Sequence, residues 1–225
     1  GLNPLTGRLI RTGAWHGYGY LNMTLHFKLA MDYYAGGLLH ILLKPVTIIL
    51  GKVLRRNHDT QRCSTITFIK LLGGGSLVIA YPSLLGLKRA PHIRSLRLVT
   101  TPAVKQFAET LGVFDEIVVI RDHSVIALTM DAVKTLIRLF RCEAIVDFEV
   151  HSRLTTVFAL LTCAQNRVGF YTTASFRRRD IATHLLFYHP ANGVYEFYDQ
   201  VTRLFGGITV PFENASAAFL ARMGV

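Results

Sequence analysis

The chain has 225 residues, 51% of them hydrophobic, and a formal net charge of +11. This length allows one sizeable hydrophobic core with an appendage. Eight Lys and Arg residues lie in residues 1–62 against only Asp32 and Asp59, so the positive charge is densest beside an apolar N-terminal segment. That placement favours an anionic membrane surface as the partner and disfavours nucleic acid.

The first sixty residues divide into two segments. Residues 1–30 are rich in glycine and aromatic residues without a clear period, and we expect an irregular or non-native leader. Residues 31–60 are hydrophobic and basic, with an apolar stretch from Ala35 to Gly51 that Lys44-Pro45 interrupts. This stretch is at the lower limit for a spanning helix, which favours a helix lying flat on a membrane. Three basic residues would then meet the headgroups: Lys52, Arg55 and Arg56. The alternative is a core helix docked on the domain.

From Thr65 onward, apolar runs rich in β-branched residues alternate with helical patterns. Strands are expected at residues 65–72, 95–101, 116–120, 144–149 and 166–171. Helices are expected at residues 77–89, 102–111, 125–141, 152–163 and 193–205. Alternation of strands and helices with short links implies right-handed crossovers and a mostly parallel sheet. The predicted fold class is therefore α/β, with one domain over residues 63–210.

Three glycines and a serine stand between the first strand and the first helix of this domain: Gly73, Gly74, Gly75 and Ser76. Glycines allow a tight turn and close backbone approach, and free N–H groups at the start of a helix favour an anion. In an open parallel sheet this turn lies at the carboxyl edge, where ligand clefts form. No Lys-Ser/Thr follows the glycines, and Val78 replaces the third residue of a dinucleotide fingerprint, so both motifs are disfavoured. A tight turn without a ligand is the alternative.

A second polar cluster follows the fourth predicted strand. Side chains alternate along a strand, so Asp147, Glu149 and His151 would share one face. Two carboxylates and an imidazole there could hold or deprotonate a hydroxyl nucleophile. The alternative is a hydrogen-bond cluster at a helix N-terminus around His151 and Ser152, where an acid is also favourable.

A third cluster consists of three consecutive arginines in a predicted loop: Arg177, Arg178 and Arg179. Guanidinium groups bind phosphate with two parallel hydrogen bonds, which favours a phosphate site. A solvated loop is the alternative. The three cysteines are widely spaced without metal-ligand spacing, which indicates buried thiols in a reducing compartment and predicts no metal site.

Several of these runs carry a family resemblance. The run from Phe68 to Lys88, which contains the glycine turn, resembles the opening motif of the heptosyltransferase family of glycosyltransferases, family 9. The runs Ala144–Arg153 and Asn166–Phe170 resemble its later motifs in the expected order and spacing, so that the resemblance spans roughly residues 63–206. The segment that begins at Met31 resembles a short membrane-associating leader found in a subgroup of this family.

The resemblance implies a fold and a reaction. The fold is the N-terminal, acceptor-side half of a glycosyltransferase B fold, a Rossmann-like and mostly parallel sheet flanked by helices. Residues 211–225 would be the start of an interdomain linker or a truncated tail. The family transfers a sugar, with inversion and without a metal or cofactor, from a nucleotide sugar to a phosphorylated, lipid-linked glycan such as lipopolysaccharide core. The expected location is the cytoplasmic face of a bacterial inner membrane. This half alone is expected to be inactive.

The resemblance also implies roles for the clusters. The family has Gly-Asp in its first loop, with the Asp as base for the acceptor hydroxyl, and alignment on Pro82 puts Ser76 there. Serine is no base near neutral pH without help, so Glu149 or Asp147 is expected to engage the hydroxyl. The turn and His151 would shape the cleft, and the arginine run would bind acceptor phosphates. The alternative is a non-catalytic, membrane-associated module that binds glycan or phosphate; an oxidoreductase is disfavoured by the imperfect glycine pattern.

Overall fold

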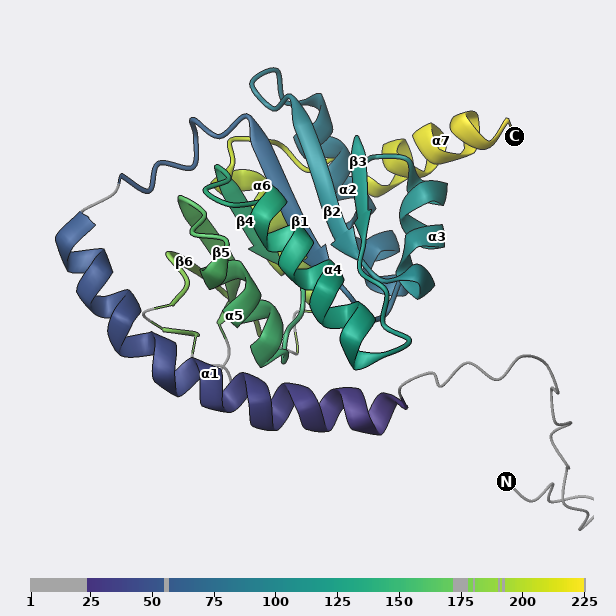
Figure 1. Ribbon diagram of the computed structural model, residues 1–225. Helices are drawn as coiled ribbons and strands as arrows, with labels where there is room; N and C mark the ends of the chain where they lie inside the picture. Colours follow the sequence, from purple (N-terminus) through teal and green to yellow (C-terminus); the bar gives the residue numbers. More distant parts are fainter. Residues whose placement is uncertain are drawn as a thin grey trace, which may run out of the picture.

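The computed structural model describes residues 24–54, 57–171, 178–179, 181–189, 191 and 193–224. Its elements, shown in Figure 1, are α1 (Leu25–Leu54), β1 (Thr65–Lys70), α2 (Gly75–Arg89), β2 (Ser95–Thr100), α3 (Pro102–Leu111), β3 (Glu116–Val119), α4 (Val125–Arg138), β4 (Ala144–Asp147), α5 (Arg153–Leu161), β5 (Asn166–Tyr171), β6 (His184–Phe187), α6 (Val194–Leu204) and α7 (Phe212–Met223).

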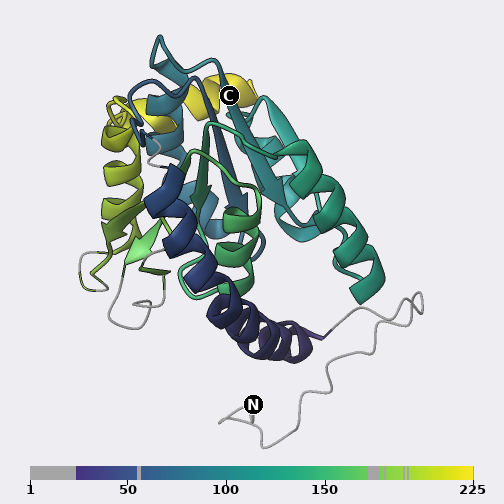
Figure 2. The same ribbon diagram turned by 60° about the vertical axis from the view of Figure 1, so that its left-hand side comes forward.

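The strands form one six-stranded sheet in the order β3-β2-β1-β4-β5-β6, and every neighbouring pair is parallel. Helices α4 and α5 lie over one face of the sheet, and α2, α3 and α6 lie over the other (Figures 1 and 2). The strand order reverses between β1 and β4, which makes the crevice beyond their carboxyl ends the topological switch point, where such sheets bind ligands.

The hydrophobic core fills both faces of the sheet. On β1, Ile66 and Phe68 belong to the larger cluster together with Leu77 of α2. Ile69 points to the other face and belongs to a smaller cluster with Ala159 of α5. A strand that is buried on both faces reads as a continuous apolar run, and this explains the composition of β1.

The predicted α/β fold with a mostly parallel sheet is confirmed, and six of its elements differ from the expectation. Helix α2 begins at Gly75, inside the glycine run, and α4 ends at Arg138 rather than at residue 141. Strand β1 ends at Lys70 and β4 at Asp147, each two residues early, because their ladders end there. Strand β6 and helix α7 were not predicted. Strand β6 has only four residues, and α7 lies in the segment that we expected to be a linker or tail.

Helix α1 begins at Leu25, within the segment that was expected to be irregular, and runs through Pro45. It packs on α5, where Gly36 allows close approach: a Cβ atom at Gly36 would lie 2.8 Å from the Cβ atom of Arg153. In the described part of the chain, no helix has the length and apolarity to cross a bilayer. Residues 1–23, and the side chains expected on headgroups, lie outside what the structure describes: Lys52, Arg55 and Arg56.

Helix α2 also makes a close backbone contact, at Gly86. A Cβ atom there would lie 2.2 Å from the carbonyl oxygen of Ile208. We therefore expect Gly86→Ala to lower the free energy of unfolding by about 1–3 kcal/mol, although alanine favours a helix. Urea unfolding measures this, with Gly75→Ala as the matched control, because a Cβ atom at Gly75 meets nothing within 4 Å. Equal stability of the two variants would contradict the close packing.

Candidate functional site

The glycine turn lies at the carboxyl end of β1, on the switch point. Gly73 adopts the left-handed backbone region, with φ of +73°, which favours glycine. Gly74 is covered by a ring, since a Cβ atom there would lie 2.2 Å from Cδ2 of Phe107. The Ser76 hydroxyl donates to the carbonyl oxygen of Gly73 at 2.8 Å. The turn is therefore shaped by a left-handed glycine, a covering ring and a hydrogen bond from Ser76.

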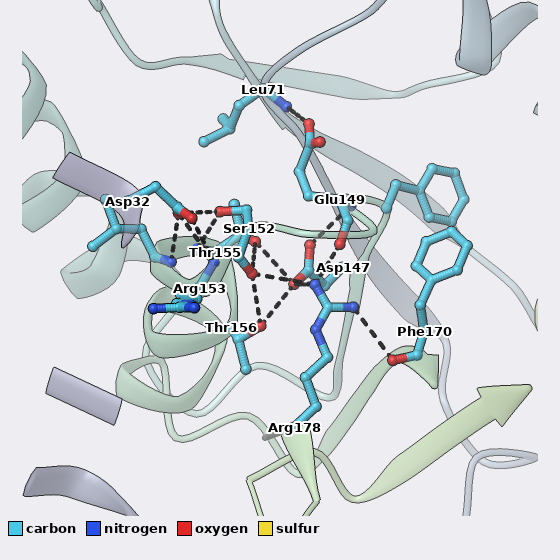
Figure 3. A network of polar contacts seen from close by, with 12 residues as sticks. Asp32, Leu71, Asp147, Glu149, Ser152, Arg153, Thr155, Thr156, Phe170 and Arg178 are labelled. Atoms are coloured by element: carbon cyan, nitrogen blue, oxygen red, sulfur yellow. Dashed lines mark hydrogen bonds and ion pairs between the residues drawn. The ribbon is translucent and has the colours of Figure 1, made fainter. Parts of the chain in front are cut away.

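Glu149 connects the two loops that flank the switch point. Its Oε1 atom accepts hydrogen bonds from the backbone N–H groups of Leu71 and Leu72, both at 2.8 Å. Its Oε2 atom lies 3.4 Å from Nζ of Lys70, and the side chains of this pair are 12% and 8% exposed. Figure 3 shows the carboxylate reaching from the loop after β4 to Leu71. Glu149 thus holds the backbone that leads into the glycine turn.

The residues at the end of β2 bind the backbone of Lys70 and Leu71 from the side opposite to Glu149. Thr100 and Thr101 donate from Oγ1 to the carbonyl oxygens of Lys70 and Leu71, at 2.6 and 2.7 Å. Beside Ser76, burial raises the pKa of the Tyr198 hydroxyl to about 12. A phenol with this pKa stays protonated near neutral pH and is able to donate a hydrogen bond.

Asp147 and Arg178 form a buried ion pair beneath the loop after β4, with side chains 4% and 5% exposed. The Asp147 carboxylate accepts from the hydroxyls of Thr155 and Thr156, at 2.9 and 3.3 Å, and from the Arg178 guanidinium at 3.2 Å (Figure 3). Arg178 also donates to the carbonyl oxygens of Glu149 and Ser152. Burial raises the pKa of the Asp147 carboxyl, and the charge of Arg178 opposes that rise.

The structure corrects the expectation that Asp147, Glu149 and His151 share one face. Strand β4 ends at Asp147, so the alternation of a strand does not apply to the two later residues. Asp147 faces α5, Glu149 faces the loop after β1, and His151 is exposed. The alternative, a hydrogen-bond cluster at a helix N-terminus, is confirmed: Ser152 caps α5 by accepting from the N–H group of Thr155.

The three arginines also differ from the expectation of one phosphate-binding run. Arg178 is buried and its guanidinium is engaged by protein oxygens, so it does not face a cleft. Arg179 is exposed. Arg177 lies outside the described residues. Of this run, only Arg179 is placed by the structure where a solvent-borne phosphate could reach it.

Sequence reasoning missed Lys70, Tyr198 and Asp32. A lysine at the end of an otherwise apolar, buried strand was the signal for Lys70, because a buried ammonium needs a partner. Asp32 is the one acid of α1, and its carboxylate accepts from the Ser152 hydroxyl at 2.6 Å and from the N–H group of Leu154 at 2.9 Å (Figure 3). It therefore supplements the cap of α5 from a helix about 120 residues earlier.

Among the described residues, no group of His, Cys, Asp or Glu side chains is arranged to hold a metal ion. A groove of about 580 Å³ lies between α2, α3 and α7, and its walls are mostly apolar, with Phe107, Phe212 and Phe219 among them.

The strand order, the parallel ladders and the turn at the switch point together define a Rossmann-like α/β domain. No protein-family model and no curated protein matches the chain. Among solved structures, the fold is similar to the crystal structure of the glycosyl transferase family 9 from Veillonella parvula DSM 2008, with a TM-score of 0.55 and 15% sequence identity. The match covers 75% of this chain and 52% of that chain, so the present chain spans about half the length of that protein. The likeness establishes the fold.

Proposed function

We propose that this chain is the acceptor-side domain of a glycosyltransferase similar to the heptosyltransferases. The complete enzyme would transfer a sugar, with inversion and without a metal or cofactor, from a nucleotide sugar to a phosphorylated, lipid-linked glycan such as lipopolysaccharide core. It would work at the cytoplasmic face of a bacterial inner membrane. The observation that carries the proposal is the glycine turn at the switch point, with Glu149 holding the backbone that leads into it, in a fold similar to that of a family 9 glycosyltransferase.

Within this proposal, the turn and the exposed His151 shape the edge that receives the acceptor, and Arg179 contacts its phosphates. Glu149 acts as a positioning residue, because its carboxylate already accepts two backbone hydrogen bonds and pairs with Lys70. Asp147 stabilises the fold through Arg178. Neither carboxylate is presented to an acceptor hydroxyl in this arrangement, so the base is sought outside this pair.

The glycine turn at the switch point also favours one alternative, a non-catalytic module that binds glycan or phosphate at a membrane. Ser76, at the place of the family's aspartate, donates its hydroxyl to the turn itself. With Glu149 and Asp147 both engaged by protein groups, the turn has a binding surface without an evident base.

Backbone amide NMR of the 225-residue chain tests the proposal. Titration with a phosphorylated lipopolysaccharide-core glycan should shift the resonances of residues 73–76, and titration with a nucleotide sugar alone should leave them unchanged. The opposite pattern would contradict an acceptor-side role. Sugar transfer is then assayed on the product of the whole reading frame: if it binds glycan but does not transfer sugar from any nucleotide sugar offered, the non-catalytic alternative holds.

A further inference from the structure

Helix α1 is apolar along most of its length, yet it meets the domain through polar and small residues. Its polar and small residues recur every four positions on the side that meets the domain: Lys28, Asp32, Gly36 and His40. The apolar residues on the other side are exposed: Tyr34 by 74%, Leu38 by 60%, Ile41 by 71% and Ile49 by 62%. We call these four residues the outer stripe. A helix that covers a domain normally turns its apolar face inward, so an outer stripe of this kind indicates an apolar partner.

Two contacts fix where this helix lies. Lys28 binds the carboxylate of Asp122, in the loop after β3, at 2.5 Å. Asp32 accepts from the N-terminus of α5, which follows β4. Both partners stand at the carboxyl edge of the sheet, and in Figures 1 and 2 the first half of α1 runs along this edge. The first part of the outer stripe, Tyr34 and Leu38, therefore lies along the edge that holds the glycine turn, and Ile41 and Ile49 continue it along the second half of the helix.

The charge around α1 indicates the kind of apolar partner. The one acidic residue of α1 is Asp32, and its carboxylate accepts hydrogen bonds from the Ser152 hydroxyl and the N–H group of Arg153. The sequence of residues 1–62 carries eight Lys and Arg residues against two acids, and two of the eight, Lys28 and Arg62, pair with Asp122 and Asp59. An apolar stripe beside excess positive charge fits a bilayer with anionic headgroups, where burial of apolar side chains and attraction to lipid charge act together.

We propose that α1 seats the carboxyl edge of the sheet against an anionic lipid surface, so that the glycine turn opens toward the headgroup layer. The lipid surface occupies the outer stripe, and the contacts of Lys28 and Asp32 set the orientation. A lipid-linked acceptor would then reach the turn without leaving the bilayer. The inference rests on the membrane location in the proposed function but not on sugar transfer, so its test uses no transfer assay.

The first test measures co-sedimentation of the 225-residue chain with vesicles of equimolar phosphatidylglycerol and phosphatidylcholine. Leu38→Gln/Ile41→Gln should lower the partition coefficient about tenfold or more, because two exposed apolar side chains lose their burial in lipid. Val133→Gln/Ile137→Gln is the matched control, since these α4 residues are 49% and 72% exposed, and it should bind like the parent chain. Pure phosphatidylcholine vesicles should bind more weakly.

The second test measures orientation. A fluorophore is attached through Leu72→Cys, in the exposed loop after β1, or through Arg94→Cys, exposed before the start of β2. The parent chain treated with the same label is the blank, since Cys63 is buried and the other cysteines are partly buried. Lipids carrying a headgroup quencher should quench the label at residue 72 several-fold more than the label at residue 94. Lys28→Ala/Asp32→Ala should keep vesicle binding and lose this difference.

Three results would overturn the inference. Equal quenching at residues 72 and 94 in the otherwise unchanged chain would show that the carboxyl edge of the sheet does not face the lipid surface. If the Leu38→Gln/Ile41→Gln variant is folded by circular dichroism and binds vesicles like the parent chain, lipid does not cover the outer stripe. Sedimentation of a dimer that this double variant dissociates assigns the stripe to a second copy of the chain instead. Absence of glycan binding at residues 73–76 would contradict the proposed function and leave these results unaffected.

Discussion

Replacing Glu149 with alanine is expected to lower the free energy of unfolding by about 3–5 kcal/mol, the cost of breaking a buried ion pair by removing one partner. The reason is that the Lys70 side chain, 8% exposed, would lose its carboxylate partner, and the N–H groups of Leu71 and Leu72 would lose their acceptor. Denaturant unfolding measures the change. Glu109→Ala is the matched control, because Glu109 pairs with Lys105 on an exposed helix surface and should cost less than about 1 kcal/mol.

Glutamine at position 149 separates a positioning role from a role as base. Its carbonyl oxygen retains an acceptor for the two backbone N–H groups but loses the charge that faces Lys70, so we expect an intermediate loss of about 1–3 kcal/mol. Hydrogen exchange of Leu71 and Leu72 should rise with that loss. If instead Glu149→Gln left stability and exchange unchanged while sugar transfer by the complete enzyme fell by orders of magnitude, Glu149 would be the base after all.

The second large effect is expected at Arg178. Arg178→Met leaves the Asp147 carboxyl buried without its cation, and we expect a loss of about 3–5 kcal/mol near neutral pH. The combined change Asp147→Asn/Arg178→Met removes both charges and should recover part of that loss. Arg179→Met is the control: Arg179 is exposed, so this change should alter the free energy of unfolding by less than about 0.5 kcal/mol.

The loss at Arg178 should depend on pH. Burial raises the pKa of Asp147 above its unfolded value of 3.8, so the folded state binds more protons than the unfolded state between the two values. The contribution of this group is therefore greatest below the unfolded pKa and falls as pH rises through the folded pKa. Removing Arg178 raises the folded pKa further, so urea unfolding should show a larger loss at about pH 7 than at about pH 4. Equal losses at both would contradict a charged, buried Asp147.

The sheet was predictable because its strands are short apolar runs separated by helical patterns, and burial on both faces forces that composition. The glycine turn was predictable for a similar reason: Gly73 needs a left-handed backbone, and few other residues adopt it. Both signals are local, since each is contained within about ten neighbouring residues.

The candidate site was harder to predict because its contacts are not local. Glu149 binds residues 77 and 78 positions earlier, and Arg178 lies 31 positions after Asp147. The strand alternation that was used for Asp147, Glu149 and His151 depends on the ladder continuing, and the ladder ends at Asp147. The run of three arginines likewise does not reveal that Arg178 is buried and pairs with the carboxylate of Asp147.

The docking of α1 on α5 has a consequence for synthesis of the protein. Asp32 and Ser152 are 120 residues apart, and at about 5–20 residues per second the ribosome adds Ser152 roughly 6–24 s after Asp32. During that interval α1 has no domain to dock on. A nascent chain would thus present its apolar helix first, and the α/β domain on which the helix docks would be made second.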